Sequence, residues 1–197
     1  MEQPTAPYLL VGLGNPGREY RETRHNVGFM VIDQVCKASG IALSRVQSKA
    51  IIGLGQFAGR RLVLAKPQTF MNLSGQAVAA LVRFYKVPFE QILIAHDDLD
   101  LPLGTLRLRP GGGSAGQKGI ASTIQQLGTQ EFGRMRIGIG RPPGQMEPSA
   151  YVLQAFSKGE QALVDQMLSR AVSAVESFLQ NGLETAMNQH NGSLQER

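Results

Sequence analysis

The sequence contains a single cysteine and no tryptophan. One cysteine, Cys36, excludes an intrachain disulfide framework and a cysteine-rich zinc site, and we interpret it as a small buried helix residue. Aromatic residues are also few, with 4 Tyr and 8 Phe, so base stacking is not expected to drive recognition of a nucleic acid. No apolar run approaches membrane-spanning length, and the start MEQPTAP lacks the basic and apolar segments of a signal peptide. We therefore expect a cytoplasmic protein.

Length and charge point to one basic domain. A chain of 197 residues that is 42% hydrophobic can bury one sizeable core, which favours a single domain over 1–197. The formal net charge is +5, and no acidic residue lies between Asp100 and Glu131, an interval that contains Arg107, Arg109 and Lys118. This uneven distribution predicts a positive face that suits a polyanionic partner.

Apolar patterning predicts alternating strands and helices. Short apolar runs bounded by turn residues predict strands at about 8–13, 50–57, 61–66, 91–96, 103–109 and 134–140. Helical spacing follows Val27 and Ser74, and a long helix follows the capping-box pair Ser157 and Glu160 and ends near Gly182. Alternation of this kind indicates an α/β fold with helices on both sides of a twisted sheet. The hairpin-like pair 50–57 and 61–66 makes that sheet mixed.

Two glycine-rich segments interrupt this pattern. The segment 110–117 cannot hold a fixed regular element, so we predict a flexible loop, a candidate lid. The segment Gly12 to Gly17 reads G-x-G-x-x-G after an apolar run, as in dinucleotide-binding proteins. That fingerprint requires a helix to begin at the glycines, whereas here the helical period begins only at Val27. The match is therefore interpreted as accidental, and no cofactor is expected.

Polar residues at the ends of apolar elements are the candidate site. His25 precedes a helix, and Asp97 follows the apolar run 92–95, so Asp97 can accept an N–H from His25 and fix its tautomer. Alone, His25 would be interpreted as a helix cap or a surface residue. No Ser or Cys lies in a nucleophile-elbow context, so water is the expected nucleophile. Asn15 and Asn72 can donate to a developing oxyanion, although turn formation is the alternative for both.

The acidic cluster Asp97, Asp98 and Asp100 is an alternative candidate for a metal site. Asp98 points away from the other two on a strand, and no second acid-rich segment completes a coordination shell, so no metal is expected. Basic residues form a further pattern on two predicted strands. Thr105, Arg107 and Arg109 alternate with leucines, and so do Arg134 and Arg136 with Met135 and Ile137. These arginines are expected to share a solvent-facing side that could bind phosphate, or simply to be solvated strand faces.

Five segments of the sequence together closely resemble bacterial peptidyl-tRNA hydrolases. In chain order they are GLGNPG at 12–17, TRHNVG at 23–28, KPQTFMNLSG at 66–75, HDDLDLP at 96–102 and RIGIGRP at 136–142. The resemblance spans nearly the whole chain, and it implies one twisted mixed sheet wrapped by helices. It also implies cleavage of the ester that joins a peptide to the terminal ribose of tRNA, without cofactor or metal, by a protein expected to be a monomer.

The resemblance also implies roles for particular residues. His25 would activate water, Asp97 would orient His25, and Asn15 and Asn72 would hold the substrate and stabilise the tetrahedral intermediate. Met71 and Tyr20 would line the substrate groove. Arg109 and Arg136 would bind the 5′-phosphate of the tRNA, next to the acceptor arm.

One segment departs from the family pattern. Where the family usually has His-Asn-Gly, with an asparagine that helps to bind the catalytic water, this chain has Gln117-Lys118-Gly119. A lysine cannot accept a hydrogen bond, so Lys118 cannot replace that amide, although it adds a charge that could bind the acceptor arm. We expect activity to survive with a different arrangement of water. The alternative is a non-hydrolytic RNA-binding relative of the same fold, as some plant organelle splicing factors are.

Overall fold

Eight strands form one mixed β-sheet in the computed structural model, which describes residues 5–194. Their order across the sheet is β2-β3-β4-β1-β5-β7-β6-β8. β1 pairs in parallel with β4 and β5, and β5 pairs in parallel with β7, whereas β2, β3, β6 and β8 are antiparallel to their neighbours. The strands are β1 (Tyr8–Gly12), β2 (Arg45–Gln47), β3 (Ala50–Phe57), β4 (Arg60–Pro67), β5 (Ile92–Asp98), β6 (Thr105–Arg109), β7 (Gly133–Gly138) and β8 (Gly192–Ser193).

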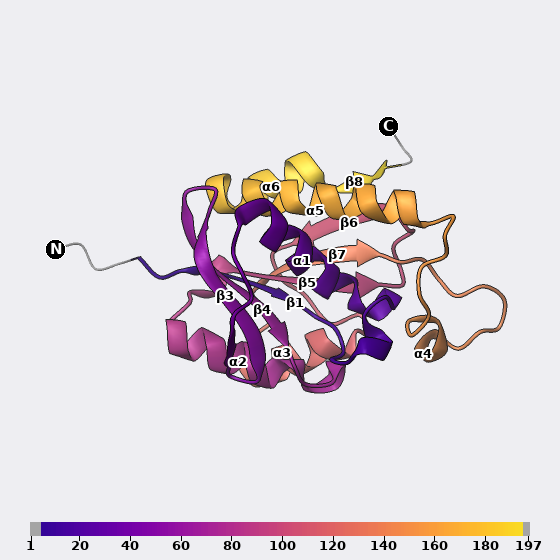
Figure 1. The fold of residues 1–197 in the computed structure, drawn as a ribbon, viewed down its shortest axis with the longest axis horizontal. Coiled ribbons are helices and arrows are strands. Elements are labelled where there is room, and N and C mark those ends of the chain that lie inside the picture. The colour runs from indigo at the N-terminus through magenta and orange to yellow at the C-terminus, as the bar shows by residue number, and fades with distance from the viewer. Residues whose placement is uncertain (1–4, 195–197) are drawn as a thin grey trace.

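Helices cover both faces of this sheet, as predicted. Figure 1 shows α1, α5 and α6 over one face and α2 and α3 over the other. The α-helices are α1 (Val27–Ser39), α2 (Ser74–Tyr85), α3 (Lys118–Leu127), α4 (Pro148–Tyr151), α5 (Gln161–Asn181) and α6 (Leu183–His190). Short 3-10 helices occur at η1 (Arg18–Tyr20), η2 (Arg24–Asn26), η3 (Met71–Leu73) and η4 (Phe89–Gln91).

The core consists of two apolar layers that the sheet separates. One layer packs α1 and α5 on residues such as Leu10, Leu93 and Met135, and the other packs α2 on residues such as Val11 and Ile94. Adjacent residues of a strand point to opposite faces, which is why Leu10 and Val11 belong to different layers. The almost wholly apolar strands β1 and β5 are buried on both faces, as central parallel strands require.

All six strands expected from the sequence are present, with ends shifted by a few residues. β5 continues through Asp98, and β6 begins only at Thr105 because Gly104 forms a turn at φ +87°. The mixed sheet is confirmed by the antiparallel pairing of β3 with β4. The short strands β2 and β8 and the helices α3, α4 and α6 were not predicted. Cys36 lies on α1 as expected, but it is only half-buried.

The turn after β1 does not begin a helix at its glycines. β1 ends at Gly12, two 3-10 helices follow, and α1 begins at Val27, so the structural requirement of a dinucleotide loop is not met. Close packing instead explains Gly28, because a Cβ there would lie 2.6 Å from the Leu13 backbone and would collide with the carbonyl oxygen of Ala95. The start of α1 therefore lies against the ends of β1 and β5, and this contact places His25 beside β5.

Within residues 5–194, none of the helices is both long and apolar enough to cross a membrane.

Candidate active site

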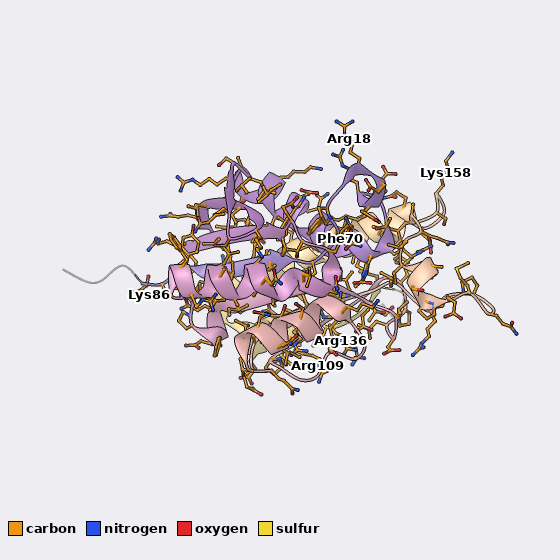
Figure 2. The ribbon with its side chains drawn as sticks, turned by 90° about the horizontal axis from the view of Figure 1, so that it is seen from below. Arg18, Phe70, Lys86, Arg109, Arg136 and Lys158 are labelled. Carbon is orange, nitrogen blue, oxygen red and sulfur yellow. The ribbon has the colours of Figure 1, made fainter. Side chains whose placement is uncertain are left out.

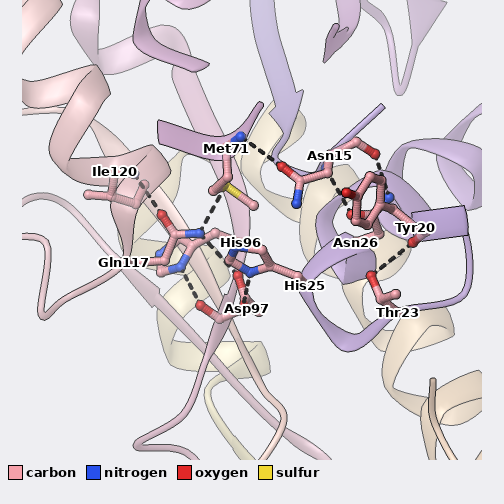
Figure 3. A network of polar contacts seen from close by, with 10 residues as sticks. All are labelled: Asn15, Tyr20, Thr23, His25, Asn26, Met71, His96, Asp97, Gln117 and Ile120. Carbon is pink, nitrogen blue, oxygen red and sulfur yellow. Dashed lines mark hydrogen bonds and ion pairs between the residues drawn. The ribbon is translucent and has the colours of Figure 1, made fainter. Parts of the chain in front are cut away.

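His25 and Asp97 form the central pair of the site. His25 lies on η2, where its backbone N–H donates to the carbonyl of Val152, and Asp97 is the penultimate residue of β5. Nδ1 of His25 and Oδ2 of Asp97 are 2.8 Å apart, and their side chains are 14% and 4% exposed. A carboxylate only accepts, so in the neutral imidazole Nδ1 carries the proton and Nε2 remains a free acceptor. The predicted contact between these residues is confirmed (Figure 3).

Gln117 holds the second oxygen of Asp97. Its Nε2 donates to Oδ1 of Asp97 at 3.0 Å, and its Oε1 accepts the backbone N–H of Ile120 at 2.7 Å as the N-cap of α3. Sequence reasoning named Gln117 only as part of a departure from the family pattern and missed this contact. A signal was present, because a polar residue that precedes Ile120 and Ile124 at helical spacing indicates the start of a helix.

Asn15 is fixed by hydrogen bonds that leave its amide nitrogen without an acceptor in the described part of the chain. Asn26, which sequence reasoning missed, accepts the backbone N–H of Asn15 at 2.8 Å and donates to its carbonyl at 2.9 Å. The side-chain Oδ1 of Asn15 accepts the backbone N–H of Met71 at 2.8 Å. Because that N–H can only donate, the other amide atom of Asn15 is Nδ2, and within residues 5–194 it has no hydrogen-bond acceptor. One amide donor is therefore presented to whatever binds beside His25.

Met71, Asn72 and Tyr20 are the remaining residues expected to contact the substrate. Met71 is only 3% exposed, and its sulfur lies 3.3 Å from Nε2 of Gln117, so Met71 is a buried residue that packs against Gln117. Asn72 is exposed on η3, and its side chain makes no hydrogen bond within the described residues. The ring of Tyr20 meets the exposed ring of Phe70 edge to face, with centroids 6.4 Å apart.

The arginines of β6 and β7 lie on one face of the sheet, because Arg107 pairs with Arg136 and Arg109 with Arg134 across the two strands. Arg107 is exposed and Arg109 is half-buried, and Figure 2 shows Arg109 and Arg136 beyond the side of α3. We call Arg107, Arg109 and Arg136 the arginine face. Nε of Arg136 donates to Oδ2 of Asp98 at 2.7 Å, which fixes its guanidinium.

The expectation that Thr105 and Arg134 face solvent is wrong. Arg134 is 2% exposed and donates to the carbonyl of Gly113 at 2.6 Å and to that of Gln130 at 3.1 Å. Burial, with the positive charge of Arg109, lowers the pKa of Arg134 to about 10. The alternation assigned these residues to the correct face, but the glycine-rich loop covers Arg134, which a strand pattern does not reveal.

Lys118 is the first residue of α3 and is exposed. The segment before it, between β6 and α3, has no regular secondary structure, and the hydrogen bond from Arg134 to Gly113 attaches it to β7. The flexibility of that loop stays a prediction.

Arg24, the residue before His25, forms an ion pair with Glu160, which follows α4 in the chain. We call this ion pair the latch. Two hydrogen bonds of 3.1 and 3.0 Å join the guanidinium to the carboxylate, and the rings of Tyr151 and Phe156 lie 4.6 and 5.0 Å from Arg24. Burial opposes ionisation of Glu160, but hydrogen bonds from Arg24 and from the Ser157 backbone, with the charge of Arg24, give it a lowered pKa overall. The latch thus holds the segment after α4 against the residue next to His25.

The arrangement suits the activation of water. His25 can accept a proton at Nε2, Asp97 stabilises the imidazolium that forms, and the Nδ2 of Asn15 can donate to an oxyanion. Among residues 5–194, no group of three His, Cys, Asp or Glu side chains is placed to hold a metal ion. Geometry of this kind fits hydrolysis of an activated acyl group such as an ester.

Comparison with known proteins identifies the family. The peptidyl-tRNA hydrolase family matches residues 9–197. A peptidyl-tRNA hydrolase of Thermoanaerobacter sp. is 46% identical over 185 residues, which cover 94% of this chain and 100% of the relative. A chloroplastic peptidyl-tRNA hydrolase of Arabidopsis thaliana is 49% identical over 177 residues, 89% of this chain and 62% of that protein. A crystal structure of peptidyl-tRNA hydrolase from Acinetobacter baumannii superposes with a TM-score of 0.90 at 39% identity and 98% coverage of each chain. With both its sequence and its fold matched over nearly its full length, the chain belongs to the peptidyl-tRNA hydrolase family.

Proposed function

We propose that this chain hydrolyses peptidyl-tRNA and releases free tRNA and the peptide. The observation that carries the proposal is the His25–Asp97 pair, with Nδ1 and Oδ2 at 2.8 Å, in a chain of this family. A histidine oriented in this way can act as a general base near neutral pH. The alternative, a non-hydrolytic RNA-binding relative, is not favoured, because the family and the relative that match nearly the whole chain are named peptidyl-tRNA hydrolases.

The proposed reaction uses the four side chains His25, Asp97, Asn15 and Asn72. Nε2 of His25 removes a proton from water as its oxygen attacks the ester carbonyl carbon, and Asp97 stabilises the imidazolium. The Nδ2 of Asn15 donates to the resulting oxyanion, and Asn72 holds the terminal ribose end of the substrate. When the intermediate collapses, the bond between the carbonyl carbon and the ribose oxygen breaks. His25 then returns its proton to that oxygen, which completes the balance without a cofactor or metal.

The proposal assigns substrate binding to Tyr20, Met71 and the arginine face. Tyr20 and Met71 would contact the peptide end, while Arg109 and Arg136 would bind the 5′-phosphate of the tRNA. A guanidinium fork suits a phosphate because it donates two parallel hydrogen bonds, and Asp98 already fixes Arg136 through Nε. The substrate is a product of translation, and we propose the cytoplasm as the compartment of this chain. A monomer stays a prediction.

Lys118 is proposed to bind the acceptor arm while lacking the amide that would help to hold the catalytic water. Its exposure at the first residue of α3 supports contact with a passing strand of RNA. We expect Lys118→Asn to raise kcat and weaken tRNA binding, as measured by single-turnover cleavage and by titration with deacylated tRNA. An unchanged or lower kcat would contradict this role.

The experiment that tests the function is release of free tRNA from an N-acetylated aminoacyl-tRNA without added metal. The unmodified protein and His25→Ala are compared at equal concentration, with thermal unfolding as the control for folding. We expect rapid release by the unmodified protein and loss of release in the variant. If neither protein cleaves while both bind tRNA in a salt-dependent manner, the hydrolase proposal is wrong.

A further inference from the structure

Asp97 is held at both of its oxygens. Oδ2 faces Nδ1 of His25 at 2.8 Å, and Oδ1 accepts from Nε2 of Gln117 at 3.0 Å. A carboxylate fixed on one side only can rotate about its side-chain bonds and misalign the imidazole that it orients. The second contact therefore bears on the direction in which Nε2 of His25 points.

Gln117 cannot reverse its amide. The backbone N–H of Ile120 donates to Oε1 at 2.7 Å, so the carbonyl oxygen must face the start of α3 and the NH2 group must face Asp97. Gly119 leaves room for this arrangement, since a Cβ there would lie 2.6 Å from the Met71 sulfur and 3.1 Å from Oε1 of Gln117. The helix start thus determines which atom Asp97 meets.

Gln117 also joins the two halves of the site. Its Nε2 lies 3.3 Å from the sulfur of Met71, and the backbone N–H of Met71 donates to Oδ1 of Asn15 at 2.8 Å. Figure 3 shows the resulting chain of contacts, from Asn15 through Met71 and Gln117 to Asp97 and His25. The amide that would meet the oxyanion and the base that would activate water are therefore connected through Met71 and Gln117.

We propose that Gln117 is a positioning residue for the hydrolytic reaction, which aligns Asp97 and His25 with Asn15 through a neutral amide anchored on α3. The inference rests on the proposed function. A neutral donor has a specific advantage here, because it orients Asp97 without cancelling the negative charge that stabilises the imidazolium. Glutamine also keeps one protonation state, so its own contact with Asp97 does not change with pH.

The first variant separates this role from helix capping. Gln117→Ser retains an N-cap oxygen for the backbone N–H of Ile120 but is too short to reach Asp97. We expect kcat to fall about 10- to 100-fold, the scale set by small misplacements of catalytic groups. KM and the thermal midpoint should change little. The matched control is Gln125→Ser, the same replacement at an exposed position of α3, which should cleave as the unmodified protein does.

The second variant gives a readout that a structural role would not change. Gln117→Glu preserves length and capping but places a second carboxylate against Asp97. The added negative charge favours the imidazolium form of His25, so the acid limb of the pH profile of kcat should move up by about one pH unit. Wild-type kcat in Gln117→Ser together with an unmoved profile in Gln117→Glu would overturn the inference.

Failure of the inference and failure of the proposed function give different results. If the unmodified protein cleaves, His25→Ala does not, and the Gln117 variants behave as wild type, only the positioning role is wrong. If His25→Ala cleaves normally, the proposed mechanism itself is wrong and Gln117 loses its role with it. If loss of cleavage in the Gln117 variants follows a lower thermal midpoint and recovers in both at a lower assay temperature, helix capping explains the effect and the inference is overturned.

Discussion

The two atoms of the Asn15 side-chain amide have different roles: the oxygen stabilises the fold, and the nitrogen takes part in the proposed chemistry. Oδ1 accepts the backbone N–H of Met71, while Nδ2 makes no hydrogen bond within residues 5–194. Asn15→Asp preserves the acceptor for Met71 but removes the amide donor. We expect kcat to fall about 100-fold or more, the usual cost of losing one oxyanion donor. Single-turnover cleavage measures this loss.

The control for that prediction is Asn15→Ala, which removes the acceptor as well. It should lower the free energy of unfolding by about 1–3 kcal/mol, because the buried backbone N–H of Met71 is left without a partner. Asn15→Asp should unfold close to the wild-type midpoint. Near-normal cleavage by Asn15→Asp would show that the amide does not act on the reaction.

His96, next to Asp97 on β5, makes stability depend on pH. Burial lowers its pKa below 6.5; Nδ1 donates to the carbonyl of Asp97, and Nε2 is buried without a hydrogen-bond partner in the described chain. The unfolded chain therefore binds a proton first, and stability is lost as the pH falls below about 6.5. Relative to His96→Gln, the unmodified protein should lose stability as the pH falls from 6.5 to 5, by at most about 1.4 kcal/mol per pH unit.

Urea unfolding at several pH values measures this difference, because all other titrating groups are common to the two proteins. Parallel pH profiles would contradict the assignment to His96.

Individual site residues differed in how well the sequence revealed them. The contact of His25 with Asp97 was predicted. His25 precedes an apolar helix and Asp97 follows an apolar strand, and the ends of these two elements lie at the same edge of the sheet. Asn26 and Gln117 were not recognised, since their roles depend on contacts with residues 11 and 20 positions away in the chain. Which atoms meet over such separations is decided by packing, and periodicity carries no information about it.

At the scale of elements, the Arg24–Glu160 latch ties the segment after α4 to η2. The lowered pKa of Glu160 means that its stabilising contribution is present above about pH 4.5 and is lost as the pH falls through the lower folded-state value. Glu160→Gln should therefore reduce the free energy of unfolding at pH 7 by about 1–2 kcal/mol. The difference from the unmodified protein should be smaller at a pH well below 4.5 than at pH 7.

Urea unfolding at the two pH values tests the latch, with Glu90→Gln as an exposed control on η4 that should match the unmodified protein. An equal loss of stability at both pH values would mean that packing, and not the ion pair, accounts for the effect.

Sequence signals identified the long elements better than their ends. Ser74 was expected to cap α2 but is its first residue, with an Oγ that is buried without a partner among the described residues. The expected capping box is half present, because the Glu160 carboxylate accepts the backbone N–H of Ser157, yet α5 begins only at Gln161. The start of α3 was missed because glycines precede it, and β8 is too short to have a pattern.

At the scale of the whole molecule, the topology gathers residues from distant parts of the chain. The parallel strands β1, β4 and β5 end at one edge of the sheet, where Asn15, Met71 and Asp97 follow or end them (Figure 1). The alternation of strands and helices was sufficient to predict this class of fold. It also indicated where the site lies, since ligands bind beyond the carboxyl ends of such strands. The order β1-β5-β7-β6 was not predictable, because pairing between non-consecutive strands depends on which faces the helices cover.

The same topology places exposed arginines at both ends of the sheet. The arginine face can therefore be tested with two variants that have the same net charge. Arg107 lies on β6, opposite Arg136 of β7, whereas Arg45 lies on β2 at the other end of the sheet. Replacing either exposed arginine by glutamine lowers the net charge by the same amount. Phosphate binding releases counterions, so only a lost contact changes the slope of affinity against salt.

Arg107→Gln should therefore weaken tRNA binding and reduce the slope of log K against log salt by about 1, whereas Arg45→Gln should leave the slope unchanged. Titration of deacylated tRNA that carries a 5′-phosphate, over a series of salt concentrations, measures both quantities. If the two variants lose equal affinity with equal slopes, the overall charge attracts tRNA and the arginine face makes no local contact. A reduced slope for Arg107→Gln alone would instead place the RNA backbone along β6 and β7, on the side of the sheet from which the glycine-rich loop leads to Gln117.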